Sequence, residues 1–219
     1  MRFSNYMLRV TSYRWLVFVG LFAVAACSNM GKKKDADKPQ LPEGEQAPFV
    51  VIPNPYQPGP VPGPAKQEYA TIKKAMAEQK WAQAKGLLNL MVETYPKLSG
   101  PYINLGIAHH ALGEKEQAEK AFRFAIETNP QNFDAYPRLG LLLREQGRFD
   151  EAEATYLQAL ALWPHHLASA KNLGILYDLY MGRFDDALVY YRLSQNIAGG
   201  EDRQLKGWII DLERRMADQ

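Results

Sequence analysis

The sequence contains a single cysteine, Cys27, among its 219 residues. One cysteine excludes a disulfide framework within the chain. The lack of a Cys-x-x-Cys pair also removes the commonest thiolate arrangement for zinc. We therefore expect no disulfide, no metal centre and no cofactor.

Net charge is also small, at +2. A protein that binds nucleic acid by neutralising phosphates needs a larger positive excess. Three of the positive charges, Arg2, Arg9 and Arg14, precede residue 27, where no Asp or Glu occurs, and without them the formal charge is −1. The part of the chain that folds is nearly neutral, so we expect no nucleic-acid partner.

Sequence motifs of catalysis are missing as well. No His-Glu-x-x-His pattern, phosphate-binding loop or Gly-x-Ser-x-Gly elbow occurs. The four histidines form two adjacent pairs, His109-His110 and His165-His166. Adjacent side chains on a helix diverge by about 100°, so neither pair can readily share a metal ion. We expect these histidines to be core or surface residues and the protein not to be an enzyme.

The N-terminus lacks acidic residues, and residues 15–26 lack any charge. Twelve apolar residues cover about 18 Å as a helix, short of the roughly 30 Å of a hydrocarbon core. A positive head, a short apolar stretch and small residues at its end are typical of a secretory signal. Residues 1–26 are therefore predicted to be a signal peptide.

The only cysteine directly follows this stretch. Val24-Ala25-Ala26-Cys27 resembles the lipobox of bacterial lipoproteins. The resemblance implies that the Cys27 thiol receives diacylglycerol and that Cys27 becomes the first residue after cleavage. The next residue is Ser28 rather than the Asp that implies inner-membrane retention, so we expect an outer-membrane lipoprotein facing the periplasm. The alternative is an ordinary signal peptide followed by an unrelated cysteine.

Proline is concentrated in one region, because nine of the fourteen prolines lie between Pro39 and Pro64. Such spacing removes backbone donors and favours extended polyproline II structure. Residues 27–65 are therefore predicted to be a lipidated, disordered tether that lifts a domain off the membrane. Residues 49–52 and Tyr56 are more apolar than a spacer requires, so the alternative is a docking segment.

From residue 66 the chain repeats with a period of 34 residues. The repeating positions are Pro96/Pro130/Pro164, Leu105/Leu139/Leu173, Gly106/Gly140/Gly174, Ala118/Ala152 and Ala125/Ala159. This period with these residues resembles the tetratricopeptide repeat, in which each unit is a pair of antiparallel helices. One unit cannot bury its helices alone, so stacked units share a continuous core.

The repeats predict an all-α solenoid of four units, at about residues 66–98, 99–132, 133–166 and 167–200. Thirteen residues separate Gly174 from Ala187, one more than in the other units, which predicts a longer turn or a local bulge near Tyr180-Met181. Residues 201–219 carry an apolar stripe at helical spacing and are predicted to form a capping helix.

The resemblance also implies a groove, lined by the first helix of each unit, that holds an extended peptide or a partner helix. Repeat position places its lining at Asn104, Arg138 and Asn172, at Ile107, Leu141 and Ile175, and beside them at His110, Arg144 and Lys171. A terminal-carboxylate clamp would need Lys and Asn where this chain has Ile103 and Ile107, so we do not expect that specificity. The alternative is that these side chains only solvate a helix face.

These features predict a membrane-anchored module that binds another envelope protein or peptide as a scaffold or assembly factor. The chain resembles the pilot lipoproteins of type IV pili, which help a secretin to assemble. Its C-terminal part resembles repeat lipoproteins encoded beside TonB-type energy-transduction components. The alternative is a structural envelope protein that binds peptidoglycan or self-associates as a homodimer through its first unit.

Overall fold

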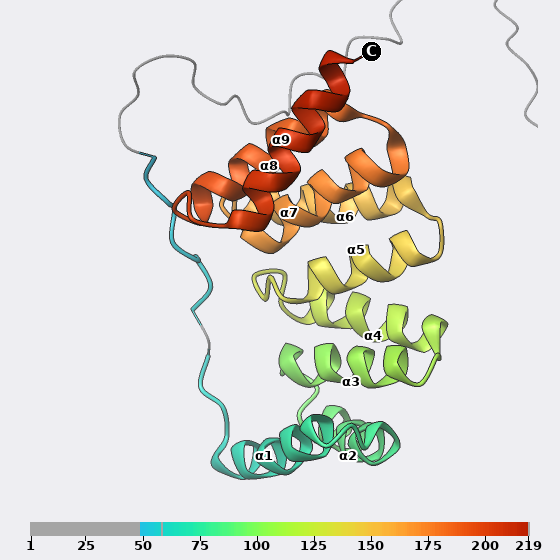
Figure 1. The fold of residues 1–219 in the computed structure, drawn as a ribbon. Coiled ribbons are helices and arrows are strands. Elements are labelled where there is room, and N and C mark those ends of the chain that lie inside the picture. Colours follow the sequence, from blue (N-terminus) through green and yellow to red (C-terminus); the bar gives the residue numbers. More distant parts are fainter. Residues whose placement is uncertain (1–48, 58, 219) are drawn as a thin grey trace, which may run out of the picture. The chain divides into compact units, whose positions relative to one another are not determined.

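The computed structural model describes residues 49–57 and 59–218 (Figure 1). The predicted signal peptide, Cys27 and most of the predicted tether lie outside these residues, so their assignment stays a prediction. Within the described part of the chain, no helix is both long and apolar enough to cross a membrane.

The described residues form α-helices, one π-helical turn and no strand, which confirms the all-α prediction. The helices are α1 (Gly63–Ala77), α2 (Trp81–Thr94), α3 (Ser99–Ala111), α4 (Lys115–Thr128), α5 (Ala135–Glu145), α6 (Phe149–Leu162), α7 (Leu167–Leu176), η1 (Tyr177–Met181), α8 (Phe184–Ile197) and α9 (Arg203–Ala217). Each helix packs against the next along the chain, so the pairs stack as a solenoid from α1 to α9 (Figure 1).

Within a pair, the two helices approach closely because a glycine on the first faces an aromatic ring on the second. A Cβ atom at Gly106 would lie 2.5 Å from Cε1 of Phe122, a separation that real Cβ atoms do not show. Tyr156 fills the same position against Gly140 in the third pair, and both Phe122 and Tyr156 are buried. The recurring glycine is therefore the space in which the aromatic side chain lies.

The first pair lacks this combination, as its sequence predicts. Ile72 stands at the glycine position and Leu88 at the aromatic position, 34 residues before Gly106 and Phe122 respectively. Both side chains are fully buried, so a larger first residue is matched by a smaller second one. The core of the first unit is therefore filled by a side chain larger than glycine on its first helix and one smaller than an aromatic ring on its second helix.

The extra residue of the fourth unit is accommodated as a π-helical turn, η1, directly after α7. The N–H of Arg183 donates to the carbonyl of Tyr177 at 2.9 Å, and Gly182 ends the turn with a φ of 63°. A positive φ is accessible to glycine without strain. The predicted bulge near Tyr180-Met181 is thus confirmed as one wide helical turn.

Helix α9 covers the end of the last pair. Asp202 begins it, accepting hydrogen bonds from the N–H groups of Gln204 and Leu205 at 2.9 and 3.0 Å. Leu205 and Leu212 are fully buried against the preceding helices, whereas Ile210 on the opposite side is 66% exposed. A helix with one side buried against the last pair and the other exposed is what a capping helix requires.

The predicted tether is wrong at its C-terminal end. Residues 63–65 belong to α1, because Pro64 fits the first helical turn and Ala65 is fully buried. The expected disorder is also wrong for residues 52–56, which run extended and contact the repeats. Tyr56 packs against the buried pair Phe133 and Tyr136.

The capping role of α9 predicts a difference between two substitutions on the same helix. Leu212→Ala should lower the free energy of unfolding by about 3 kcal/mol, because it leaves a cavity in the core. Ile210→Ala should change it by less than about 0.5 kcal/mol. Urea unfolding followed by circular dichroism measures both, and equal effects would show that α9 is not packed as a cap.

Candidate functional site

The residues predicted to line the groove lie on three neighbouring first helices. Helix α5 contacts both α3 and α7, so these residues form one surface, here called the first-helix surface. Its members are Asn104 and Ile107 on α3, Arg138, Leu141 and Arg144 on α5, and Lys171, Asn172 and Ile175 on α7.

Two of these side chains already have partners inside the protein. The Asn104 amide donates to the Tyr69 hydroxyl of the first unit and to the Gly100 carbonyl. Lys171 lies 3.5 Å from a carboxylate oxygen of Asp202 and 5.0 Å from the centre of the Trp208 ring, both from the cap. The neighbouring unit and the cap therefore supply partners for Asn104 and Lys171, which leaves these two side chains with fewer free hydrogen-bonding groups for a ligand.

The apolar members are only half-buried. Ile107 and Ile175 pack against the main core, and Leu141 between them is half-buried as well. The expected apolar strip therefore exists as the outer edge of the core.

Arg138 and Asn172 keep their hydrogen-bonding capacity. Arg138 is exposed and Asn172 half-buried, and neither makes a hydrogen bond or ion pair to another residue that the structure describes. Both can donate to a ligand on this surface.

Arg144 is the unusual member of the surface. Its Nε and Nη1 atoms are buried, and no described residue accepts a hydrogen bond from them. The guanidinium lies 5.2 Å from the centre of the Tyr180 ring of η1. The buried Tyr156 hydroxyl, also on this unit, has no partner among the described residues either. Arg144 as a whole is half-buried, but two buried N–H groups of a cation without an acceptor are unfavourable, so the protein itself provides too few acceptors here.

Electrostatics around Tyr156 agree with that geometry. Burial raises the pKa of Tyr156, and the positive charge of Arg144 acts in the opposite direction. The Tyr156 hydroxyl is therefore protonated at neutral pH and can donate, as the guanidinium does. The two groups together match an oxygen acceptor, and a negatively charged one best.

The fourth unit shows how such a position is satisfied. Asp178 follows Gly174 by four residues, as Arg144 follows Gly140. Asp178 accepts from the Tyr191 hydroxyl at 3.2 Å and from Arg215 of the cap at 2.7 Å. An acidic side chain thus joins the tyrosine and an arginine in unit four, whereas unit three provides no acid there.

The histidines have separate partners and do not form a catalytic or metal-binding group. His109 contacts Glu114, and His110 lies 2.8 Å from Glu145. His166 shares a 2.9 Å hydrogen bond with Ser169, but Ser169 is fully buried and cannot meet a substrate. Among residues 49–57 and 59–218, no three metal-binding side chains come together.

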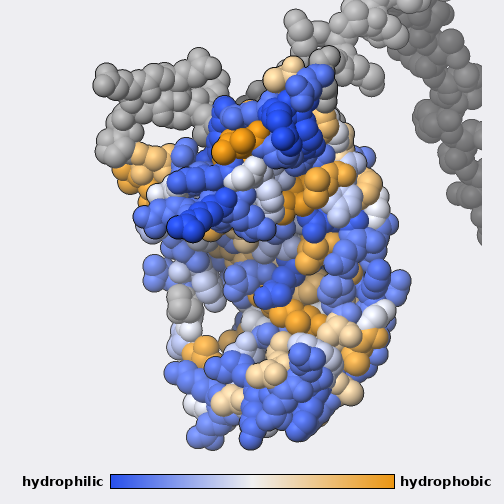
Figure 2. Space-filling view, viewed as in Figure 1, coloured by the Kyte–Doolittle hydropathy of each residue, from blue (hydrophilic) through white to orange (hydrophobic). Residues whose placement is uncertain are grey.

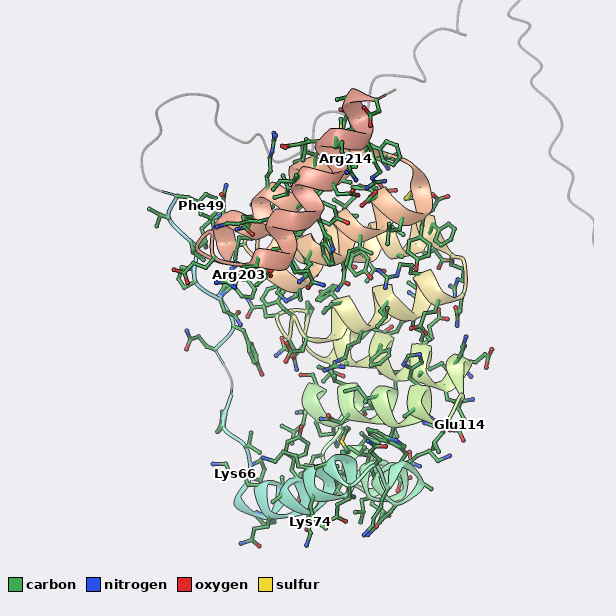
Figure 3. All side chains as sticks on the ribbon, in the orientation of Figure 1. Phe49, Lys66, Lys74, Glu114, Arg203 and Arg214 are labelled. Atoms are coloured by element: carbon green, nitrogen blue, oxygen red, sulfur yellow. The ribbon has the colours of Figure 1, made fainter. Side chains whose placement is uncertain are left out.

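The turn between α6 and α7 holds the extended segment. The Trp163 indole donates to the Ile52 carbonyl at 2.8 Å, and His165 accepts from the Ile52 N–H. The Phe49 ring lies 4.8 Å from the His165 ring, at the end of the segment labelled in Figure 3. Residues 49–56, for which docking is the alternative interpretation, therefore have a contact surface within the same chain, and turns between repeats form it.

Sequence reasoning missed Tyr156 and Tyr180 as neighbours of Arg144. Tyr156 occupies an aromatic packing position of the repeat, and its hydroxyl carries no periodic signal. The π turn that brings Tyr180 over Arg144 was foreseeable as an insertion, but its orientation was not.

Comparison with known proteins agrees with the fold. A tetratricopeptide repeat profile matches residues 103–166. No curated protein sequence matches the chain.

Solved structures are similar over most of the chain. TTC0263, a repeat protein of Thermus thermophilus, is 27% identical with a TM-score of 0.59, covering 68% of this chain and 80% of its own. PilF of Pseudomonas aeruginosa is 21% identical with a TM-score of 0.62, covering 70% and 69%. YrrB, described as having an unusual peptide-binding site, is 20% identical with a TM-score of 0.54, covering 64% and 71%.

His166 predicts a pH dependence of stability. Burial lowers its pKa to about 4, although the charge of Asp134 acts oppositely. The unfolded chain binds this proton near pH 6.5, so the stabilisation by neutral His166 is complete above that pH and falls as the pH drops toward 4. At pH 5 the loss is about 2 kcal/mol. Urea unfolding above pH 6.5 and at pH 5 should show this loss of unfolding free energy in the wild type and a smaller loss in His166→Gln. An equal loss in the two proteins would contradict the prediction.

Proposed function

Residues 63–200 are a tetratricopeptide-repeat solenoid, and we propose that it is a protein-interaction module held at a bacterial envelope membrane by a lipid on Cys27. Its first-helix surface binds a segment of another envelope protein. In this role the chain acts as a scaffold or assembly factor.

The observation that carries the binding role is the unpartnered guanidinium of Arg144. Two of its nitrogens are buried without an acceptor among the described residues, beside a tyrosine hydroxyl in the same condition. Evolution of the free protein alone would favour an apolar side chain at such a place, because an unpaired buried charge costs free energy. A partner that inserts an acceptor supplies what is missing.

Neighbouring members of the surface extend the contact along α5 and α7. The N–H groups of the Arg138 and Asn172 side chains are available as hydrogen-bond donors, and Leu141 provides apolar surface between them. This combination fits an extended segment whose carbonyl groups accept from Arg138 and Asn172 while one acidic side chain reaches Arg144. The proposal therefore names Arg138, Leu141, Arg144 and Asn172 as contacts and gives Asn104 and Lys171 supporting roles.

The anchor is proposed from the sequence around Cys27. Two or three acyl chains on one cysteine hold a protein stably at a membrane, whereas a single chain holds it only marginally. Retention at the outer membrane on its periplasmic face is proposed from Ser28 after the cysteine.

Arg144→Met is the test of the binding role, because it should separate stability from binding. Removing the unpaired charge should raise the free energy of unfolding by about 1 kcal/mol. The same variant should recover about tenfold less of the partner that the wild type captures from detergent-solubilised envelopes. Urea unfolding and quantitative pull-down measure the two effects.

Arg148→Met is the matched control. Arg148 donates to Glu119 and Glu151, both at 2.6 Å, so its removal should lower stability by about 1 kcal/mol and leave capture unchanged. If Arg144→Met destabilises the protein as Arg148→Met does, the guanidinium has a structural partner and the proposal loses its main support.

Cys27→Ser tests the anchor. The variant should incorporate no radiolabelled palmitate and should give an uncleaved product or one that leaves the membrane fraction, because the thiol that would carry the lipid is absent. Labelling and fractionation of cells expressing each form check this. Equal membrane retention of both forms would exclude the lipid anchor.

A further inference from the structure

A cavity of about 680 Å³ lies away from the first-helix surface, between the extended segment and the first two helix pairs. Tyr56 and residues 59–61 form one wall, α1 another, and the turn before α3 with the start of α3 a third. Figure 2 shows the surface hollowed beside the extended segment at this level. No member of the first-helix surface lines it.

The charge of this cavity has one sign. Three lysines line it, Lys66, Lys73 and Lys97, and no Asp or Glu occurs among its described lining residues. Lys66, Tyr69 and Lys73 follow one another at helical spacing, so α1 presents them on one side. None of the three lysine side chains forms a hydrogen bond or ion pair with another described residue; the Lys73 ammonium lies 5.5 Å from the Tyr69 ring centre.

The other lysine of α1 that Figure 3 labels, Lys74, is exposed and is not among the cavity's lining residues. Nearby Lys85 is paired with Glu114 at 2.7 Å. The cavity lysines, which are exposed as well, therefore gather positive charge that no described lining residue neutralises, and this charge would attract an anionic occupant.

Polar groups suited to a peptide lie between the charges. Asn132 donates to the Ser99 hydroxyl at 2.8 Å, which orients its amide at the cavity edge, and Asn129 lies beside it. The N–H groups of Gly59 and Val61 make no backbone hydrogen bond within the described part of the chain. An extended peptide can pair with such an open backbone edge.

Apolar area completes the lining. Val61, Met91 and Leu98 border the cavity, so an occupant can bury uncharged groups between its acidic ones. A phosphate can accept from the lysines and the asparagine amides, but it offers no N–H to the carbonyl groups of residues 59–61, which an extended peptide does. The lining therefore favours a polypeptide over a phosphate.

We propose that this cavity binds an extended, acidic peptide segment of a partner protein, with Lys66, Lys73 and Lys97 pairing its carboxylates and residues 59–61 pairing its backbone. This site deepens the proposed interaction function and rests on it, but it is separate from Arg144. It gives the solenoid a second contact, specific for clustered Asp and Glu.

Fluorescence anisotropy with the full-length chain in detergent tests the site. The probe is a fluorescein-labelled peptide of about eight alternating Glu and Val residues, and the comparison peptide has Gln in place of Glu. Lys66→Gln/Lys73→Gln/Lys97→Gln should raise the Kd of the acidic probe about tenfold or more. Lys74→Gln/Lys115→Gln/Lys120→Gln removes the same charge from sites elsewhere and should change the Kd less than about twofold.

The outcomes separate this site from the first-helix surface. Arg148→Met, at a residue that belongs to neither proposed site, should bind the probe as the wild type does. Equal weakening by both lysine triples, or equal binding of the Gln peptide, would overturn the cavity site while leaving the Arg144 result intact. Loss of binding to phosphatidylglycerol vesicles in the cavity triple, with probe binding unchanged, would overturn it in favour of a lipid.

Discussion

The close approach of the two helices in the second, third and fourth pairs depends on one contact, the aromatic ring seated against a glycine. Phe122 against Gly106, and Tyr156 against Gly140, bring the helix backbones together and leave no room for a Cβ atom. Because interiors are packed to crystal-like density, this contact fixes how far each pair can open. The stacking of pairs, and so the register of the first helices, follows from it.

The same contact links the core to the exposed surface. When the aromatic residue is a tyrosine, its ring packs on the glycine and its hydroxyl lies near the side chain four residues after that glycine on the first helix. In unit four its hydroxyl meets Asp178, and in unit three it ends without a described partner, as Arg144 does. Unit two has Phe122 and therefore no buried hydroxyl there. Whether a repeat has a buried polar group available to a partner therefore depends on the hydroxyl oxygen that distinguishes tyrosine from phenylalanine at this position.

The fold was predictable because its determinants are periodic. The glycine and the aromatic residue recur with a period of 34 residues in the units that match the repeat pattern well. The one-residue insertion before Ala187 indicated the π-helical turn η1. The pairing of side chains was not predictable. Asn104 bonds to Tyr69, 35 residues earlier, and Lys171 contacts Trp208 of the cap, so their availability depends on neighbouring units. The proline content predicted a tether, but it could not predict that Ala65 is buried or that Ile52 forms hydrogen bonds with a distant turn.

The attachment of Ile52 to Trp163 and His165 has a mechanical consequence. A chain pulled from before Phe49 does not load α1 first, because the segment is fastened to the turn between α6 and α7 before it reaches Pro62. Tension enters the solenoid between its third and fourth pairs, where the most extensive core lies, and the first pair is shielded. The first pair, whose core lacks the glycine–aromatic contact, is therefore loaded only after this attachment has broken.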